Sequence, residues 1–513
     1  MVSSLGRPQS DPRKERIPMD IVLDTCPAPE CNLTPRDVVG LLDHLAAYHA
    51  HFGPAFARSE QTYWAKTYLH GLLSACERKS IEPMAVHLGV PIRPLQYFIG
   101  QSTWAIEPVI AQHQRLVGAT LAEEDGTFLI DECGVLKQGH DSAGVAPQYC
   151  GAVGKVANSQ VGVYLGYASR KGYTLLDGRL FLPELWFGEA YADKRKATEM
   201  PTTLSFQTKP EIALELLRQA LARGSVRARW LAADALYGNS VAFRDGVAAL
   251  SLYYFTAISC DTLIWRRPVA LLVPSYTGKG RKPTKLRLKT PSNAPYRVDE
   301  LAKRLPKSAW KRTTIKEGSK GPIVSDVAIV RVTEVRDGLP GPRLWLVIRR
   351  NVADPSDVRY YLSNAPETTT EAELARLLGM RWPVELTFEQ GKQEVGMDDY
   401  EVRSWPGWQH HMVMVMLAHH FLVWVRVAWK DRAPALTLNQ VRLLLTSVLP
   451  TVVFDAERAL FLVRYYQRRN HAAYLSHRKR KRKELAALAE QEAQKRRRYP
   501  GRPPKNQPVA ATS

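Results

Sequence analysis

The sequence predicts an α/β fold: a mixed sheet flanked by helices, with a β-rich insertion and an α-helical N-terminal region. Three observations lead to this prediction. Apolar strand-like runs and amphipathic helical patterns alternate between about residues 120 and 250, as they do in α/β sheets. Strand-like runs separated by turn residues fill about residues 250–365. Helical periodicity dominates before about residue 79 and after residue 371.

The composition is that of a globular protein with more than one domain. The chain has 513 residues, of which 45% are hydrophobic and 24% are charged. At roughly 100–200 residues per domain, this length corresponds to about two to four domains. The composition excludes a collagen-like, coiled-coil or wholly disordered chain.

The excess positive charge is concentrated in two segments. The formal net charge is +21; residues 266–320 carry +13 and residues 477–505 carry +9, which leaves the rest close to neutral. Two separate basic runs on an otherwise balanced protein favour a polyanionic partner, nucleic acid above all. The alternative is a solvated face and a basic tail without a partner.

The cysteines and the apolar runs indicate a cytoplasmic protein. Six cysteines, none of them in a Cys-x-x-Cys pair, argue against a disulfide framework or a zinc site. We expect Cys133 and Cys150 to be buried thiols. The first residues lack the apolar run of a signal peptide. The most apolar long run, Met412–Val425, contains His419 and His420, so we expect a core helix there rather than a membrane span.

The N-terminal region is expected to be helical after a polar, charged arm. Thr34 and Pro35 suit the N-cap and the first position of a helix, and helical patterns continue to about residue 79. In Ile81–Ile99, the small Ala85, the turn residue Gly89 and the flanking apolar residues have the spacing of a helix-turn-helix. An ordinary helical hairpin that braces the core is the alternative. In a DNA-reading second helix, the candidate base contacts are Arg93, Gln96 and Tyr97.

The central region alternates strands and helices. The expected strands are Thr127–Asp131, Gln160–Ala168, Leu175–Leu182 and Arg229–Asp234, with amphipathic helices at 210–222 and after Gly238. Asp131 and Asp234 each end an apolar strand. Because ligands bind at strand ends of open α/β sheets, neighbouring strands would bring these two carboxylates side by side.

Strands and then helices follow the second acid. Strands are expected at 327–335, 344–348 and 359–363, a helix at 371–395, and further helices to about residue 475. The basic runs Arg478–Lys483 and Lys495–Arg498 are low in complexity, and we expect a disordered tail there.

A third acid lies in the helix expected at 371–395. Arg381, Glu385 and Lys392 are spaced i, i+4 and i+11, which brings them to one face of a helix, with Glu389 close to that face. A carboxylate flanked by two cations suits a site for a metal ion and a phosphate. The alternative is a salt-bridged surface helix.

These acids stand in three long sequence blocks. The blocks are Asp131-Glu-Cys-Gly with residues 140–151 and 154–160, then Ala233-Asp-Ala-Leu-Tyr-Gly238, then Arg381-Trp-Pro-Val-Glu385 through Trp405. Over roughly residues 60–430, the chain resembles a family of bacterial insertion-sequence transposases of the DDE superfamily. The resemblance implies a ribonuclease H-like fold whose acids come from the first strand, the fourth strand and a late helix.

The resemblance also implies a catalytic site. Its catalytic and metal-binding residues would be Asp131, Asp234 and Glu385, holding two divalent ions, Mg²⁺ or Mn²⁺. Related cut-and-paste transposases share a Tyr-x2-Arg-x3-Glu-x6-Lys signature around the third acid. Arg381 and Lys392 match it and would contact the DNA backbone.

Two positions bear on that signature. Leu378 stands in the place of its tyrosine, a departure that affects the tyrosine contact and not the acid. The register of the signature selects Glu385 over Glu389 as the third acid.

The implied function is that of a DNA transposase, which binds the terminal inverted repeats of an insertion sequence and catalyses metal-dependent strand cleavage and strand transfer. Its partners would be double-stranded DNA, as element ends and as target, and a second copy of the chain in a homodimer on DNA. No membrane is expected, and the location would be the bacterial cytoplasm, at the nucleoid. The alternatives are a ribonuclease H-like nuclease without strand transfer and a catalytically inactive DNA-binding protein.

These predictions divide the chain into six segments. They are a flexible arm at 1–20, a helical DNA-binding region at 21–115, the first part of the ribonuclease H-like core at 116–245, a β-rich basic insertion at 246–357, the second part of the core with C-terminal helices at 358–475, and a basic disordered tail at 476–513. In the insertion, the candidate DNA contacts are Arg281, Lys282, Lys285 and Arg287.

Overall fold

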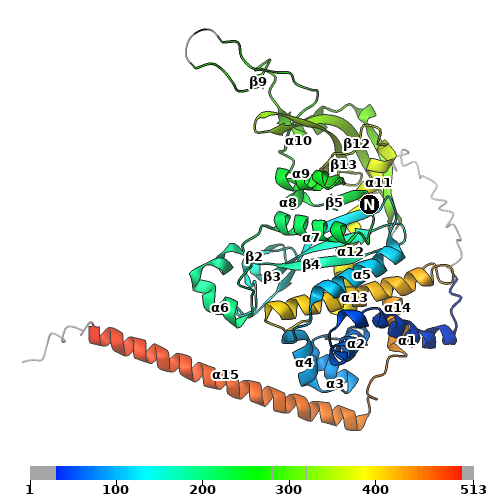
Figure 1. Ribbon diagram of the computed structural model, residues 1–513, viewed down its shortest axis with the longest axis vertical. Helices are drawn as coiled ribbons and strands as arrows, with labels where there is room; N and C mark the ends of the chain where they lie inside the picture. The colour runs from blue at the N-terminus through cyan, green and yellow to red at the C-terminus, as the bar shows by residue number, and fades with distance from the viewer. Residues whose placement is uncertain (1–29, 277, 279–280, 319–320, 499–513) are drawn as a thin grey trace, which may run out of the picture. The chain divides into compact units, whose positions relative to one another are not determined.

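The computed structural model describes residues 30–276, 278, 281–318 and 321–498, so the arm expected at 1–20 lies outside the described residues. The chain divides into two compact units, Met1–Leu449 and Pro450–Ser513. The first unit contains the sheet and the helices that pack on it (Figure 1).

One mixed sheet of twelve strands runs through the first unit. In its central part β1 pairs in parallel with β5 and β5 in parallel with β6, whereas β1 is antiparallel to β3. The other edge of β3 pairs with β4 and with the short β2. The bounds are β1 Thr127–Leu136, β2 Ala146–Cys150, β3 Lys155–Ala168, β4 Tyr173–Phe181, β5 Trp230–Ala233 and β6 Tyr253–Ile258. The predicted mixed α/β sheet is confirmed.

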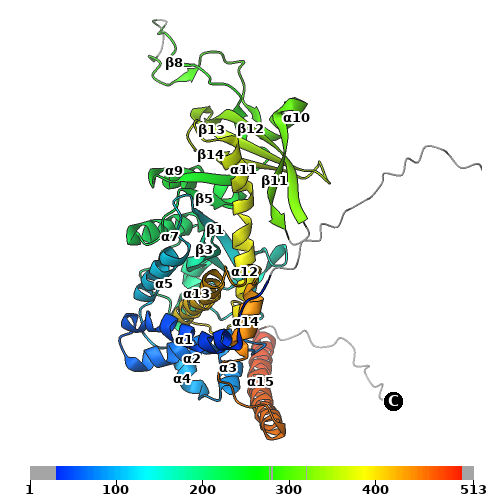
Figure 2. The same cartoon turned by 90° about the vertical axis from the view of Figure 1, so that its right-hand side faces the viewer.

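The β-rich insertion continues this sheet. Its strand β14 pairs antiparallel with β6, and β13 and β12 follow as long antiparallel neighbours. The bounds are β7 Leu263–Trp265, β10 Tyr296–Arg297, β11 Trp310–Gly318, β12 Gly321–Arg336, β13 Leu339–Asn351 and β14 Val358–Ser363. The separate pair β8 (Leu271–Leu272) and β9 (Arg287–Leu288) lies in a basic loop that extends away from the sheet (Figure 2).

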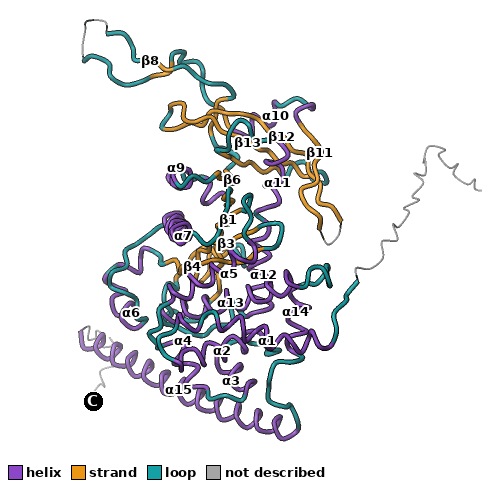
Figure 3. The backbone as a smooth tube through the Cα atoms, turned by 45° about the vertical axis from the view of Figure 1, so that its right-hand side comes forward, coloured by secondary structure: helices purple, strands orange, loops and turns teal. Residues whose placement is uncertain are grey.

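Helices cover the central strands on both faces (Figure 3). One face carries α7 (Lys209–Arg223), α8 (Ala235–Gly238) and α9 (Val241–Ala249); the other carries α5 (Ile106–Leu121), α12 (Trp382–Val395) and α13 (Trp405–Ala428). Helix α7 shows how the sequence sets such bounds. Thr208 and Glu211 form a capping box at its start, and Gly224 ends it in the left-handed conformation, with φ 66°.

Helix α13 is the central helix of the first unit. It is long and apolar enough to cross a membrane by length and composition, but 78% of its apolar window is buried inside the protein. It packs on β4 and on the N-terminal helices. The core helix predicted at Met412–Val425 is therefore confirmed. The helices around it are α1 Pro35–Ala50, α2 Ser59–Leu73, α3 Ile81–Leu88, α4 Ile92–Gly100 and α14 Leu438–Thr446.

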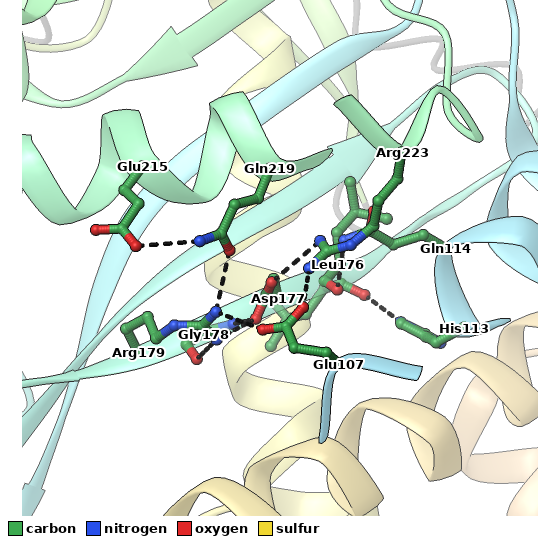
Figure 4. A network of polar contacts seen from close by, with 11 residues as sticks. Glu107, His113, Gln114, Leu176, Asp177, Gly178, Arg179, Glu215, Gln219 and Arg223 are labelled. Carbon is green, nitrogen blue, oxygen red and sulfur yellow. Dashed lines mark hydrogen bonds and ion pairs between the residues drawn. The ribbon is translucent and has the colours of Figure 1, made fainter. Parts of the chain in front are cut away.

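A polar network around the buried Asp177 joins α5 and α7 to β4 (Figure 4). Asp177 on β4 is fully buried and accepts hydrogen bonds from Arg179 at 3.0 Å and from Arg223 of α7 at 3.5 Å. Arg179 also donates to Glu107 of α5 at 3.1 Å and to Gln219 of α7 at 3.0 Å. Because a buried charge is costly without partners, this network fixes both helices against the strand.

The other elements complete the first unit. They are α6 Ala192–Ala197, α10 Val298–Arg304, α11 Glu371–Met380 and the 3₁₀ turns Gly53–Ala55, Glu184–Phe187, Glu189–Tyr191 and Lys307–Ala309. Cys133 and Cys150 are buried free thiols, as predicted.

The described part of the second unit consists mainly of one long helix, which includes residues where we expected disorder. Helix α15 spans Ala456–Arg498, whereas the sequence predicted a disordered tail at 476–513. The helix continues because this stretch is rich in Ala, Leu, Glu, Lys and Arg and contains no Gly or Pro. Residues 499–513 lie outside the described part of the chain.

Candidate active site

The two aspartates lie on neighbouring parallel strands. The parallel pairing of β1 with β5 ends at Ile130 opposite Ala233, so Asp131 and Asp234 follow at the same level. Asp131 was expected at the end of its strand, and this was wrong: β1 continues to Leu136, because its second half keeps its antiparallel pairing with β3. The end of the parallel pairing, rather than the end of the strand, brings the two aspartates side by side.

Asp234 also begins a helix. It is the N-cap of α8, and its side chain accepts hydrogen bonds from the backbone N–H groups of Leu236 at 2.9 Å and Tyr237 at 3.4 Å. A carboxylate is favoured at this place because the first N–H groups of a helix have no partner within it. The turn from β5 into α8 therefore fixes the direction of this side chain.

Arg381 joins the third acid to the first. It is the residue between α11 and α12, and its guanidinium lies 3.6 Å from Oδ2 of Asp131 and hydrogen-bonds Oε1 of Glu385. The i, i+4 ion pair of the alternative interpretation, a salt-bridged surface helix, therefore forms, but its arginine also reaches Asp131 on β1. Glu389 makes a different contact: its carboxylate accepts a hydrogen bond from Gln393 at 3.3 Å.

Lys392 lies further along the same face. Its ammonium is beside the thiol of Cys133, which stands two residues after Asp131 on β1. Side chains two apart on a strand share one face of the sheet, so Lys392 lies on the face that carries Asp131. Burial raises the pKa of the Cys133 thiol to about 11, which leaves it an unreactive neighbour of the site.

Asp131 and Asp234 are two partly buried carboxylates whose negative charges repel each other. Burial raises the pKa of Asp131 to about 7, and the negative charge of Asp234 contributes to the rise. The pKa of Asp234 is also raised, first by burial and then by the charge of Glu132. Such a pair has a strong tendency to bind a proton or a cation.

Glu132 is an acid of this region that the sequence did not single out. It points to the opposite face of β1, where its carboxylate contacts Lys209 of α7 at 2.7 Å and accepts a hydrogen bond from the Tyr237 hydroxyl at 3.0 Å. Asp131 and Glu132 are adjacent on a strand and must face opposite sides of the sheet. This alternation is the sequence signal that could have assigned them different roles. The charge of Glu132 is already matched within the protein.

The donor set suits a hard divalent cation, because carboxylate oxygens are its preferred ligands. In the described ranges, no three acid, histidine or cysteine side chains lie close enough together to hold a metal ion as they stand. The positive charge beside Asp131 is instead the guanidinium of Arg381. The raised pKa values of Asp131 and Asp234 mark the place where a cation would relieve repulsion.

The predicted DNA contacts are exposed. Helices α3 and α4 are joined at Gly89, which has a φ of 71°, and the side chains that pack beneath them include Ala85 and Leu95. The two-helix unit predicted at Ile81–Ile99 is therefore present. The exposed candidates on α4 are Arg93, Gln96 and Tyr97, and those in the basic loop of the insertion are Arg281, Lys282, Lys285 and Arg287.

A family comparison fits this geometry. Residues 51–322, more than half of the chain, match the family model described as "DDE superfamily endonuclease". The chain belongs to the DDE superfamily endonucleases. The matched range includes Asp131 and Asp234 and ends before Glu385. This DDE endonuclease therefore has the ribonuclease H-like α/β fold, and its superfamily generally uses divalent metal ions and acts on DNA.

A curated relative extends the similarity. This DDE endonuclease is 25% identical over 352 residues to the "Probable transposase for insertion sequence element IS701" of Microchaete diplosiphon. The alignment covers 67% of this chain and 78% of that protein.

Proposed function

We propose that this DDE endonuclease is a transposase that binds the terminal inverted repeats of an insertion sequence and catalyses strand cleavage and strand transfer. One observation carries the proposal: Asp131 and Asp234 lie side by side, and Arg381 joins Asp131 to Glu385. The similarity to a probable insertion-sequence transposase supports the same activity.

Asp131, Asp234 and Glu385 would hold two divalent ions, Mg²⁺ or Mn²⁺. Bound there, the ions would activate the attacking water or 3′-hydroxyl and stabilise the leaving oxygen. Glu132 keeps its charge matched by Lys209 on the far face of β1 and so stays out of this donor set.

Arg381 and Lys392 would neutralise the DNA backbone near these acids. Both lie beside groups on the Asp131 face of β1, within the reach of a phosphate bound there. Charge-assisted hydrogen bonds from a guanidinium to phosphate oxygens are among the stronger polar contacts in proteins. Arg381 would exchange carboxylate partners for phosphate partners as substrate and ions bind.

The basic segments would supply affinity, and α4 would supply sequence recognition. Arg93, Gln96 and Tyr97 are exposed on the second helix of a helix-turn-helix-like pair, where side chains can reach base edges in the major groove. Arg281, Lys282, Lys285 and Arg287 would contact backbone phosphates. Because an element has two ends, a homodimer on DNA is the expected assembly.

Strand joining separates this proposal from its nearest alternative, a nuclease that only hydrolyses. A labelled duplex carrying the DNA that flanks this gene is incubated with the protein, Mg²⁺ and a supercoiled plasmid. A transposase gives labelled DNA covalently joined to the plasmid. Cleavage without any joined product would favour the nuclease, and binding without cleavage would favour an inactive DNA-binding protein.

A further inference from the structure

Strand β11 of the insertion lies against the helices that carry the third acid. At one end of the contact, Lys311 pairs with Glu371 at the start of α11, at 2.5 Å. At the other end, Ile315 is buried in a hydrophobic cluster with Leu377 and Leu378 of α11. The insertion is therefore packed on the segment that leads into α12.

Gly379 allows this close approach. A Cβ atom at this position would lie 2.9 Å from the backbone oxygen of Ile315, which is closer than real Cβ contacts. Any larger residue would push β11 away from the end of α11. The insertion strand and the end of α11, which leads into α12, thus lie close together at this glycine.

A β-bulge redirects the next side chain. The pairing of β11 with β12 runs from Thr314 opposite Val324 directly to Lys316 opposite Ile323, so one residue is skipped. Without the bulge, Lys316 would point to the same side as Thr314. With it, Lys316 points to the other side, which is the side of Lys311 and α11. Bulges are frequent next to active sites because they redirect a side chain in this way.

The redirected ammonium lies at the start of α12. Nζ of Lys316 is 4.2 Å from the centroid of the Trp382 ring, and its charge interacts with that of Glu385. Among the described side chains no ion pair of Lys316 is found, whereas Lys311 pairs with Glu371 and Glu385 pairs with Arg381. The N–H groups of Lys316 remain available to an anion that enters beside Glu385.

We propose that Lys316 is a DNA-backbone contact of the active site, supplied to the catalytic acids by the insertion. The inference rests on the proposed function, because it requires DNA to lie at Asp131, Asp234 and Glu385. The bulge at Ile315 and the close approach at Gly379 position Lys316. The ring of Trp382 contacts one side of the Lys316 ammonium, and a phosphate oxygen binds the opposite side of the ammonium.

A lysine-reactivity footprint tests the contact without relying on cleavage. The full-length Asp131→Asn protein is acetylated briefly without divalent ions, with and without a linear duplex, and each lysine is followed by peptide mass spectrometry. Lys316 should become less reactive by about fivefold or more on DNA, as expected of a phosphate contact. Lys311, on the same strand but paired with Glu371, is the matched control and should change little. Unchanged reactivity of Lys316 would overturn the inference.

A rate measurement gives the second readout. Lys316→Met should slow single-turnover strand cleavage by roughly 10- to 100-fold, the range expected for removal of a charged hydrogen bond. Lys316→Arg should restore most of the rate, and Lys311→Met should leave it near wild type. Equal rates in Lys316→Met and wild type would contradict the role. If Asp131→Asn still cleaves while the footprint is positive, the proposed catalytic site fails but the DNA contact stands.

Discussion

Asp131 is destabilising in its ionised form. Its carboxyl is buried beside Asp234, which raises its pKa to about 7, whereas an aspartate in an unfolded chain has a pKa near 3.8. The folded protein therefore binds more protons than the unfolded chain between these values, so folding stability falls as the pH rises from about 4 to about 7. Above this window the full cost of ionising Asp131 is present.

Replacing this residue should stabilise the metal-free protein. Asp131→Asn should raise the Tm at pH 8, by roughly 1 °C for each kcal/mol recovered in a chain of this length, and the gain should shrink as the pH falls toward 4. Differential scanning calorimetry in EDTA measures it. Glu389→Gln, which replaces an exposed acid on the same helix as Glu385, is the control. A Tm gain that does not depend on pH would contradict the assignment.

The sequence predicted the acids but not their surroundings. The spacing of Arg381 and Glu385 was enough to place both on one helix face. Nothing local showed that Arg381 would also reach Asp131, since this contact joins positions 250 residues apart. Lys316 was one cation among many in a basic run, and only the bulge and the packing on α11 distinguish it.

At the scale of helices and strands, a buried ion pair connects the insertion to the core. Arg244 of α9 and Glu334 of β12 are 2% and 3% exposed in their side chains and pair directly. Glu334 also pairs with Arg336 at 2.6 Å, and Arg336 pairs with Asp245 at 2.6 Å. Arg244 donates as well to the backbone of Gly238, at the end of the short helix that Asp234 begins.

Breaking one half of this pair should be costly. Glu334→Ala should lower the free energy of unfolding by about 3–5 kcal/mol, because it leaves Arg244 charged, buried and without its main partner. The double variant Arg244→Met with Glu334→Leu should recover most of that stability. Urea denaturation measures both. A single variant as stable as wild type would show that the insertion is held in another way.

The buried histidines of α13 make the fold sensitive to acid. His411 and His419 are buried and have pKa values of about 3, mainly because burial disfavours the charged form. Nδ1 of His411 shares a hydrogen bond with the Tyr68 hydroxyl at 2.8 Å, and Nδ1 of His419 shares one with the Thr174 hydroxyl at 3.0 Å. Since unfolded histidines have a pKa near 6.5, their contribution to stability is present above that pH and is lost as the pH falls toward 3.

This effect can be isolated by substitution. The stability difference between wild type and His419→Gln should change by up to about 1.4 kcal/mol per pH unit below about pH 6 and should be constant above about pH 7. Urea denaturation over this range measures it. His140, which is exposed, gives the control variant His140→Gln. Parallel stability curves for wild type and His419→Gln would contradict the buried, neutral state.

The boundaries of helices and strands were predictable to different degrees, because the sequence signals that mark them differ in strength. The start of α1 was predictable because Thr34 and Pro35 form a local cap. The full length of β1 was not, because its second half is held by pairing with β3 despite its polar residues. The extent of α15 was not predicted either, because a low-complexity basic run is typical of disorder even where its residues have high helix propensity.

At the scale of the whole molecule, the net charge of +21 resides largely in the insertion and in the basic end of the chain. The described side chains from residue 477 to 494 are exposed, so their lysines and arginines can meet phosphates. Such contacts are insensitive to base sequence, because every phosphate presents the same charge.

Removing this segment should weaken binding to all DNA alike. Deleting residues 477–513 should flatten the dependence of log Kd on log salt by about 0.9 for each phosphate that the protein no longer neutralises. Fluorescence anisotropy over a range of KCl concentrations, with the flanking DNA and with an unrelated duplex, measures it. Weaker binding to the flanking DNA alone would mean that this segment reads sequence.

The central claim is that Asp131, Asp234 and Glu385 form one metal-dependent cleavage site. Single-turnover cleavage of a duplex carrying the DNA that flanks this gene, in Mg²⁺, tests it most directly, with Glu385→Gln compared against Glu389→Gln. We predict that Asp131→Asn, Asp234→Asn and Glu385→Gln each slow cleavage by at least about 1,000-fold, since each would remove several kcal/mol of transition-state stabilisation. Glu389→Gln should cleave like wild type, and all four should bind the duplex normally in EDTA. Cleavage that survives in Glu385→Gln but not in Glu389→Gln would contradict the account.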